Sequence, residues 1–194
     1  GDLGELRGTV WLSFAATQDI ADLNGNPLSD LTPSGSNDNY FVVSHDRPVL
    51  ASISRQTPAA QRTNATSLTW DFQFSQISRG FSLPPEAFQV MNATADVTME
   101  RYSIGFYVTA SGGNLATYDG PVYIRISDTS YADEFGNTLV GAAPSDLDDG
   151  LYELDHTAPV VTWSLGTDDA ESSGTLTVYV SGSEPLTGLE LDDF

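Results

Sequence analysis

The sequence predicts an all-β fold in which antiparallel β-sandwich units follow one another along the chain. Short runs of alternating apolar and polar residues recur over the 194 residues, and turn signals separate these runs. No stretch has helical periodicity over the length that a stable helix needs. The pattern also returns after about 110 residues, which is the size of one sandwich domain.

The repeat is clearest in two stretches that each contain a histidine. Residues 145–159 (SDLDDGLYELDHTAP) resemble residues 34–48 (SGSNDNYFVVSHDRP), and His156 follows His45 by 111 positions (156 − 45). Each stretch combines a polar turn, a short strand and a segment that contains proline. We interpret each one as the end of one unit and the joint to the next unit.

These joints divide the chain into three parts. Residues 1–46 are predicted to be the C-terminal part of a sandwich, residues 47–157 a complete sandwich, and residues 158–194 the N-terminal part of a following sandwich. Two strands cannot bury a shared apolar face alone, so both partial units should expose apolar strand faces. We expect neighbouring units of the same or an adjacent chain to cover them by strand addition.

The first part contains two predicted strands. Residues 9–14 (TVWLSF) alternate in polarity, which places three large apolar side chains on one face. Residues 22–28 (DLNGNPL) form a loop with an Asn-Gly turn signal. Residues 40–43 (YFVV) form the second strand.

The middle part contains seven predicted strands. The clearest is residues 67–74 (SLTWDFQF), in which Trp70 and three other apolar residues point to one face. The other strands are residues 49–54, 88–90, 95–99, 103–110, 121–126 and 151–154. Alternate apolar residues of these strands, Ile104 among them, should form the core.

The last part begins the same pattern again. Residues 160–165 match the first strand of the middle unit, and residues 176–180 (LTVYV) match its clearest strand. The tryptophans at 11, 70 and 163 all fall in predicted strands, so we interpret them as buried core residues and not as a sugar-binding platform.

Composition limits the classes of partner. With 27 acidic and 7 basic residues the formal net charge is −20, which disfavours nucleic acid as a partner. No apolar run is long enough to span a bilayer, so no membrane insertion is expected in this segment. The chain has no cysteine, which excludes disulfides and thiolate metal sites. Low lysine with abundant Asp, Thr, Ser, Gly and Asn fits a secreted or cell-surface β-protein.

Catalytic residues are not apparent in the sequence. His45 and His156 occupy the same position of the repeat, beside the two joints. A residue that recurs once per unit at a boundary is better explained by packing or hydrogen bonding than by catalysis. No pair of carboxylates stands in a recognisable acid/base setting. We therefore predict that the chain is not an enzyme.

Calcium is the one cofactor that the sequence suggests. Ca²⁺ takes six to eight oxygen ligands, and several turns offer carboxylate and amide oxygens within a few positions. The candidate ligands are Asp22, Asn24, Asn26, Asp133, Glu134, Asn137 and Asp155. Further acidic or amide residues near the joints are Asn37, Asp38, Asp146, Asp148 and Asp149. The alternative is that Asp, Asn and Gly are there because turns require them.

Three stretches resemble the bacterial Ig-like repeats of large surface proteins and adhesins. Residues 155–161 (DHTAPVV) resemble the Asp-x-Thr-Ala-Pro joint of these repeats. Residues 183–194 (SEPLTGLELDDF) resemble their Ser-Glu-Pro-Val-Thr-Gly stretch, and residues 132–139 (ADEFGNTL) resemble their Asp-x-x-Gly-Asn loop. The resemblance spans nearly the whole chain. The middle unit departs from it, because residues 75–77 are Ser-Gln-Ile where the repeats have Ser-Glu-Pro.

The resemblance implies tandem immunoglobulin-like sandwiches in a long extracellular bacterial protein. Such a segment would be a non-enzymatic extender, adhesive array or surface-layer block, stiffened by Ca²⁺ if the loops bind it. Its partners would be neighbouring Ig-like repeats, with a glycan or a surface protein as a possible ligand. Two alternatives remain open at this point: a carbohydrate- or protein-binding Ig-like module, and an accessory domain of a secreted hydrolase.

Overall fold

The computed structural model describes residues 3–30, 40–77, 80–141, 150–166 and 177–193, and strands dominate these residues. The strands are β1 (Gly8–Trp11), β2 (Tyr40–Val43), β3 (Val49–Thr57), β4 (Arg62–Thr63), β5 (Ser67–Gln76), β6 (Phe88–Met91), β7 (Asp96–Tyr102), β8 (Gly105–Ser111), β9 (Gly120–Ile126), β10 (Tyr152–Leu154), β11 (Val161–Leu165) and β12 (Val178–Gly182). Two short 3₁₀ helices are η1 (Pro85–Ala87) and η3 (Leu191–Asp193). The all-β prediction is confirmed for these residues.

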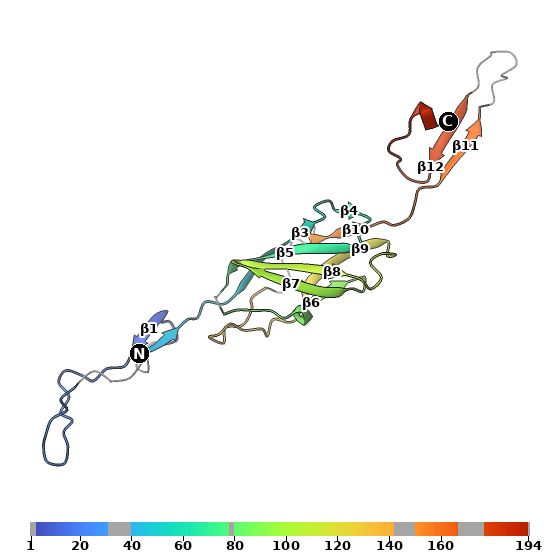
Figure 1. The fold of residues 1–194 in the computed structure, drawn as a ribbon. Helices are drawn as coiled ribbons and strands as arrows, with labels where there is room; N and C mark the ends of the chain where they lie inside the picture. Colours follow the sequence, from blue (N-terminus) through green and yellow to red (C-terminus); the bar gives the residue numbers. More distant parts are fainter. Residues whose placement is uncertain (1–2, 31–39, 78–79, 142–149, 167–176, 194) are drawn as a thin grey trace.

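The strands form three groups along the chain (Figure 1). The pair β1–β2 lies near the N-terminus, strands β3 to β10 form the central body, and the pair β11–β12 lies near the C-terminus. Single segments of chain connect the groups, around residues 44–48 and 155–160. These are the two segments that the sequence marked as joints.

Strands β3 to β10 form two four-stranded sheets with the orders β3-β5-β8-β7 and β4-β10-β9-β6. All neighbours are antiparallel except β4 and β10, which pair in parallel through Glu153 with Arg62 and Leu154 with Thr63. The predicted antiparallel pairing therefore holds for the strand pairs of the central body except at this edge. Pro58 has no N–H to donate, so the chain leaves the β3 ladder there and joins the second sheet at β4.

Alternate apolar residues of the two sheets face one another and form the core, as the alternation predicted. Ring contacts join the sheets directly: Trp70 meets Tyr152 at 5.2 Å between centroids, and Phe72 meets Phe88 at 5.0 Å, both edge to face. Fully buried aromatic and aliphatic side chains of this kind each contribute roughly 1.5–3 kcal/mol through burial. This core belongs wholly to the central body.

Tyr152 and Trp70 also satisfy their polar atoms inside the core. The Tyr152 hydroxyl lies 2.8 Å from the Pro58 carbonyl oxygen and 2.9 Å from that of Thr69. The Trp70 indole N–H donates to the Gly150 carbonyl at 2.6 Å. Burial raises the pKa of Tyr152 to about 12, so the phenol stays protonated and the core carries no charge there.

The turn between β7 and β8 differs from the prediction. Strand β8 begins at Gly105 and not at residue 103, and Ile104 lies in the turn, exposed to solvent. A side chain at position 105 would collide with the neighbouring strand, because a Cβ there would lie 2.0 Å from the Phe72 carbonyl oxygen. The close approach of two backbones therefore fixes this turn, and alternation alone could not predict it.

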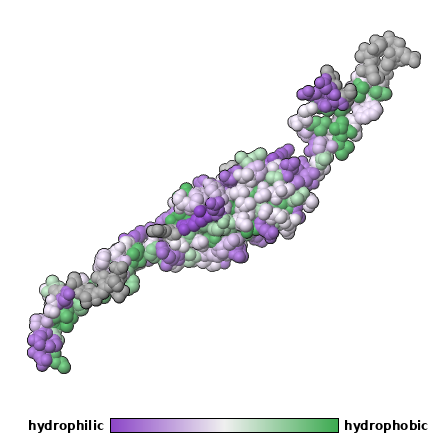
Figure 2. Space-filling view, viewed as in Figure 1, coloured by the Kyte–Doolittle hydropathy of each residue, from purple (hydrophilic) through white to green (hydrophobic). Residues whose placement is uncertain are grey.

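The two terminal pairs have no sheet packed over them within the described residues. Trp11 is 64% exposed and Trp163 is 71% exposed, whereas Trp70 is fully buried. The burial prediction is thus correct for Trp70 and wrong for the other two tryptophans. The physical reason is that each terminal pair is one layer thick. Figure 2 shows hydrophobic surface on both terminal parts.

Candidate functional site

The first joint is held by contacts from the part of the chain that precedes it. The Arg7 guanidinium donates from Nε to the Asp46 carboxylate at 2.7 Å, which is both a hydrogen bond and an ion pair. The ring of His45 places Nε2 2.9 Å from the Leu3 carbonyl oxygen. Residues 45 and 46 are thus fixed to the segment that leads into β1.

The central body holds the same joint from the other side. Arg47 donates from Nε to the Thr138 carbonyl at 2.8 Å and from Nη2 to the Thr138 hydroxyl at 2.6 Å. The Asn137 side-chain amide donates to the Ser44 carbonyl at 3.0 Å. A guanidinium that donates two such bonds fixes direction as well as distance. Four consecutive joint residues therefore touch one neighbouring unit or the other.

The second joint is held by Asp119, which lies between β8 and β9. Its carboxylate accepts the His156 backbone N–H at 2.6 Å and the Thr157 hydroxyl at 2.7 Å. These two hydrogen bonds lower the pKa of Asp119, because both favour the ionised form. The His156 ring places Nδ1 3.0 Å from the Tyr118 carbonyl oxygen. Both histidines therefore take the hydrogen-bonding role that the sequence predicted.

The two joints use opposite chemistry at the same repeat position. Arg7 precedes Asp119 by 112 positions (119 − 7), and Asp46 precedes Thr157 by 111 (157 − 46). A cation meets an anion at the first joint. At the second joint the Asp119 carboxylate accepts a hydrogen bond from the Thr157 hydroxyl and lies 3.8 Å from Nδ1 of His156. Sequence reasoning missed both pairs, because each joins residues 38 or 39 positions apart that no short motif connects.

Asp133 organises the loop that carries Asn137 and Thr138. Its Oδ1 accepts the backbone N–H groups of Phe135 and Asn137, each at 2.9 Å. The Asp133 residue is only 7% exposed. Gly136 has φ 82°, which an L side chain rarely adopts. The carboxylate thus stabilises a tight turn and positions Asn137 and Thr138, which form hydrogen bonds with the first joint.

The same loop geometry occurs at Asp22. Its Oδ1 accepts the backbone N–H groups of Asn24 and Asn26, each at 2.9 Å, and Gly25 has φ 84°. The Asn26 side chain donates to the other carboxylate oxygen at 2.8 Å. The hydrogen bonds from Asn26 and its neighbours lower the pKa of Asp22. The two loops match atom for atom at a spacing of 111 positions (133 − 22).

The predicted calcium ligands that the structure describes lie in the two Asp-organised loops and at the second joint. The carboxylates of Asp22 and Asp133 accept amide hydrogens of their own loops, and Asp155 accepts the Thr157 N–H at 3.1 Å. Glu134 lies beside Gly80. Within the described ranges no three acidic or histidine side chains gather as a metal site. The residues at 37, 38, 146, 148 and 149 lie outside those ranges. Calcium binding stays a prediction.

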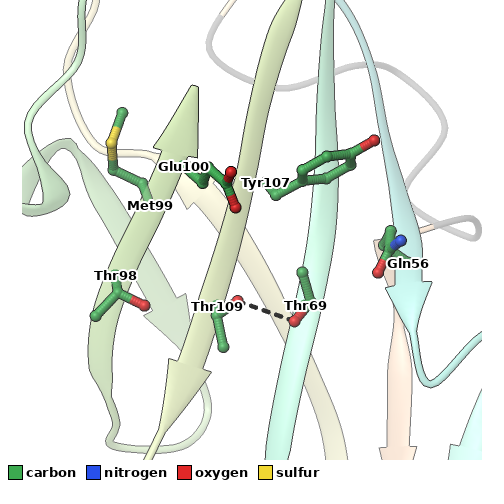
Figure 3. Close-up of a pocket in the computed structure, with 7 residues that line it drawn as sticks. All are labelled: Gln56, Thr69, Thr98, Met99, Glu100, Tyr107 and Thr109. Carbon is green, nitrogen blue, oxygen red and sulfur yellow. Dashed lines mark hydrogen bonds between the residues drawn. The ribbon is translucent and has the colours of Figure 1, made fainter. Parts of the chain in front are cut away.

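A shallow groove of about 300 Å³ lies on the outer face of the β3-β5-β8-β7 sheet (Figure 3). Its lining residues are Gln56, Thr69, Thr98, Met99, Glu100, Tyr107 and Thr109. Thr69 and Thr109 are hydrogen-bonded to each other at 2.9 Å. The ring of Tyr107 stacks on that of Tyr102 at 4.7 Å between centroids. An aromatic ring beside hydroxyl, amide and carboxylate groups is chemistry that suits a polar ligand such as a sugar.

No family model, no curated protein and no solved structure matches the chain. Among the described residues no helix has the length and apolar character that crossing a membrane requires. The candidate site is therefore defined by geometry alone. It consists of the two joints and the side chains that form hydrogen bonds with them.

Proposed function

We propose that this chain is a structural segment of a long extracellular protein, in which Ig-like β-sandwich units follow one another as spacers or assembly blocks. It has no enzymatic role in this proposal, and its partners are neighbouring units of the same kind. The observation that carries the proposal is the first joint. Residues 45 and 46 are bonded to the preceding part, and residues 44 and 47 to the following one.

The strand order of the central body supports the Ig-like assignment. A constant-type immunoglobulin domain has strands A, B, E and D in one sheet and C, F and G in the other. If β3, β5, β6, β7, β8, β9 and β10 are lettered A, B, C, D, E, F and G, the observed order β3-β5-β8-β7 reads ABED. The order β10-β9-β6 reads GFC. The extra strand β4 follows strand A in the chain and pairs with strand G in the other sheet.

The matched loops support the tandem arrangement. Asp22 and Asp133 each organise a turn with the same hydrogen bonds, although they lie in different groups of strands. Two units that share a local geometry at a fixed sequence spacing are the signature of repeat architecture. In such an array, length comes from the number of units and bending is governed by the joints.

The experiment measures a distance across the first joint by electron paramagnetic resonance. The chain has no cysteine, so Leu23→Cys and Glu100→Cys supply the only two attachment points for spin labels. We expect a narrow distance distribution for the otherwise unchanged chain. Arg47→Ala removes the bonds to Thr138 and should broaden the distribution. Arg125→Ala is the matched control, because this arginine bonds Gln89 on the sheet surface.

A broad distribution in the unchanged chain would contradict the proposal, because a freely bending joint cannot set length. The same measurement with and without a chelator tests the calcium prediction. A bound ion at the joint would narrow the distribution, and its removal would widen it. An identical distribution in both conditions would exclude calcium from this joint.

A binding module for carbohydrate is the second candidate function, and the groove beside Tyr107 favours it. The stacked pair of Tyr102 and Tyr107 supplies a rigid aromatic surface, and Gln56 and Glu100 supply polar groups next to it. A glycan-array screen tests this candidate. Binding that is lost in Tyr107→Ala would support it, and an absence of any bound glycan would remove it.

A further inference from the structure

The first terminal pair exposes Trp11 and Val42 on one face. Each terminal pair also exposes an apolar face that corresponds to the core side of the central body. On the first pair and the segment after it, this face consists of Val10, Leu12, Phe14, Phe41 and Val43. Leu12 is 72% exposed and Phe41 is 69% exposed. Contiguous apolar surface of this kind on a soluble chain marks an interaction site. Figure 2 shows hydrophobic surface on this terminal part. The central body indicates what covers such a face.

The pair β1–β2 repeats the pairing of β9 with β10. Val10 lies opposite Phe41 in the first pair, and Val122 lies opposite Tyr152 in the second, at spacings of 112 and 111 positions (122 − 10, 152 − 41). Tyr152 is fully buried, because Trp70 of strand β5 packs on it. The face of β1–β2 is therefore of the kind that a β3–β5 pair covers.

The pair β11–β12 repeats the pairing of β3 with β5. Val161 lies opposite Gly182, as Leu50 lies opposite Phe74, at spacings of 111 and 108 positions (161 − 50, 182 − 74). Its apolar face consists of Val161, Trp163, Leu165, Val178 and Val180, and the other face carries Thr162, Ser164, Tyr179 and Ser181. This pair is therefore of the kind that covers β9–β10.

We propose that the β11–β12 pair of one copy packs on the β1–β2 pair of a second copy, so that copies join head to tail. This inference rests on the proposed function, since it takes the partner to be a unit of the same kind. Phe41 then meets the face around Val178, as Tyr152 meets Trp70 in the central body. Because the two surfaces differ and lie at opposite ends of the molecule (Figure 1), each contact leaves one free face of each kind, and we expect open chains.

The two pairs of one copy cannot cover each other, because they lie at opposite ends of the central body (Figure 1), so the proposed contact joins two copies. If the β1–β2 pairs of two copies packed on each other, two faces that both correspond to β9–β10 would be in contact. In the central body, ring contacts between the sheets join β5 to β10 and to β6, so the β9–β10 face packs there on β5 and not on a face of its own kind.

The test uses analytical ultracentrifugation of the whole chain and of two variants. The unchanged chain should form species whose mass grows with concentration. Phe41→Asp and Trp163→Asp should each weaken self-association at least about 30-fold, as loss of a central apolar anchor does. An equimolar mixture of the two variants should form a one-to-one dimer that does not grow, because each variant keeps one intact face.

Matched controls change the opposite faces of the same strands. Val42→Glu introduces the residue type that Glu153 has at the corresponding position of β10, and Tyr179→Asp introduces that of Asp71 on β5. Both should associate like the unchanged chain. The circular dichroism of every variant shows whether the central body is folded.

A monomeric unchanged chain at all concentrations would overturn this inference, as would a Phe41→Asp or Trp163→Asp variant that still dimerises alone. These outcomes are separable from failure of the proposed function. A monomer with a narrow spin-label distribution would remove only the head-to-tail contact. Head-to-tail chains with a broad distribution would remove only the stiff joint.

Discussion

At the scale of single residues, Asp133 is the side chain on which the first joint most depends. It is nearly buried, and its carboxylate accepts two backbone N–H groups and a side-chain amide of the same loop. A buried donor that loses its acceptor costs about 1–3 kcal/mol. Asn137 and Thr138 extend from this loop to the joint, so the loop's conformation also determines the contacts at the joint.

We predict that Asp133→Ala lowers the free energy of unfolding of the central body by about 1–3 kcal/mol. Urea denaturation followed by the fluorescence of Trp70, with Trp11 and Trp163 replaced by Phe, measures this change. Asp128→Ala is the control, because Asp128 caps a similar turn at Ser130 but is exposed. Equal effects of the two substitutions would show that the burial of Asp133 does not increase its contribution to the free energy of unfolding.

Asp119 makes the second joint sensitive to acid. Its pKa in the folded chain is lowered by the hydrogen bonds from His156 and Thr157. The stabilisation is therefore fully present above the unfolded-state pKa of about 3.9 and is lost as the pH falls through the lower folded-state value. We expect hydrogen exchange of the His156 amide to be protected at pH 5 and to lose protection as the pH falls through the lowered pKa of Asp119. Asp119→Ala should remove the protection at pH 5; protection that persists in this variant would show that another group holds the amide.

At the scale of elements, the turn at Gly105 decides how β7 and β8 meet. A Cβ at this position would lie 2.0 Å from the Phe72 carbonyl oxygen, which no side-chain rotation can relieve. We predict that Gly105→Ala lowers the free energy of unfolding by about 2 kcal/mol or more, through displacement of two paired strands. Ser103→Ala in the same turn should change it by less than about 0.5 kcal/mol. Equal losses in urea denaturation would contradict this prediction.

Period-two alternation predicted most strands because one face of each is buried and the other is solvated. It could not find β4, which has only two residues and is held by parallel pairing with β10. Nor could it find the joint contacts. Arg47 and Thr138 are 91 positions apart, and only the folded sheets bring them together. The sequence contains recognisable acidic turns, but only the loop geometry shows which carboxylate oxygens already accept hydrogen bonds.

At the scale of the whole molecule, one body carries the entire buried core. Every residue of the buried hydrophobic core among those the structure describes lies between Leu50 and Leu154. The terminal pairs contribute no fully buried large side chain to it. The central body should therefore be thermodynamically independent of its neighbours.

We predict that residues 47–157 expressed alone fold and unfold in one cooperative transition. Single domains of this size with one continuous core behave in this way. Thermal unfolding followed by near-ultraviolet circular dichroism measures this, because the packed rings of Trp70 and Tyr152 give the signal. A non-cooperative transition, or a spectrum without aromatic signal, would show that the flanking parts are needed for folding.

The unlike partners at the two joints give the molecule an uneven response to ionic strength. Dissolved ions weaken the attraction between the exposed guanidinium of Arg7 and the carboxylate of Asp46. They have far less effect on a hydroxyl that donates to Asp119. At high salt concentration the first joint should therefore become more mobile than the second.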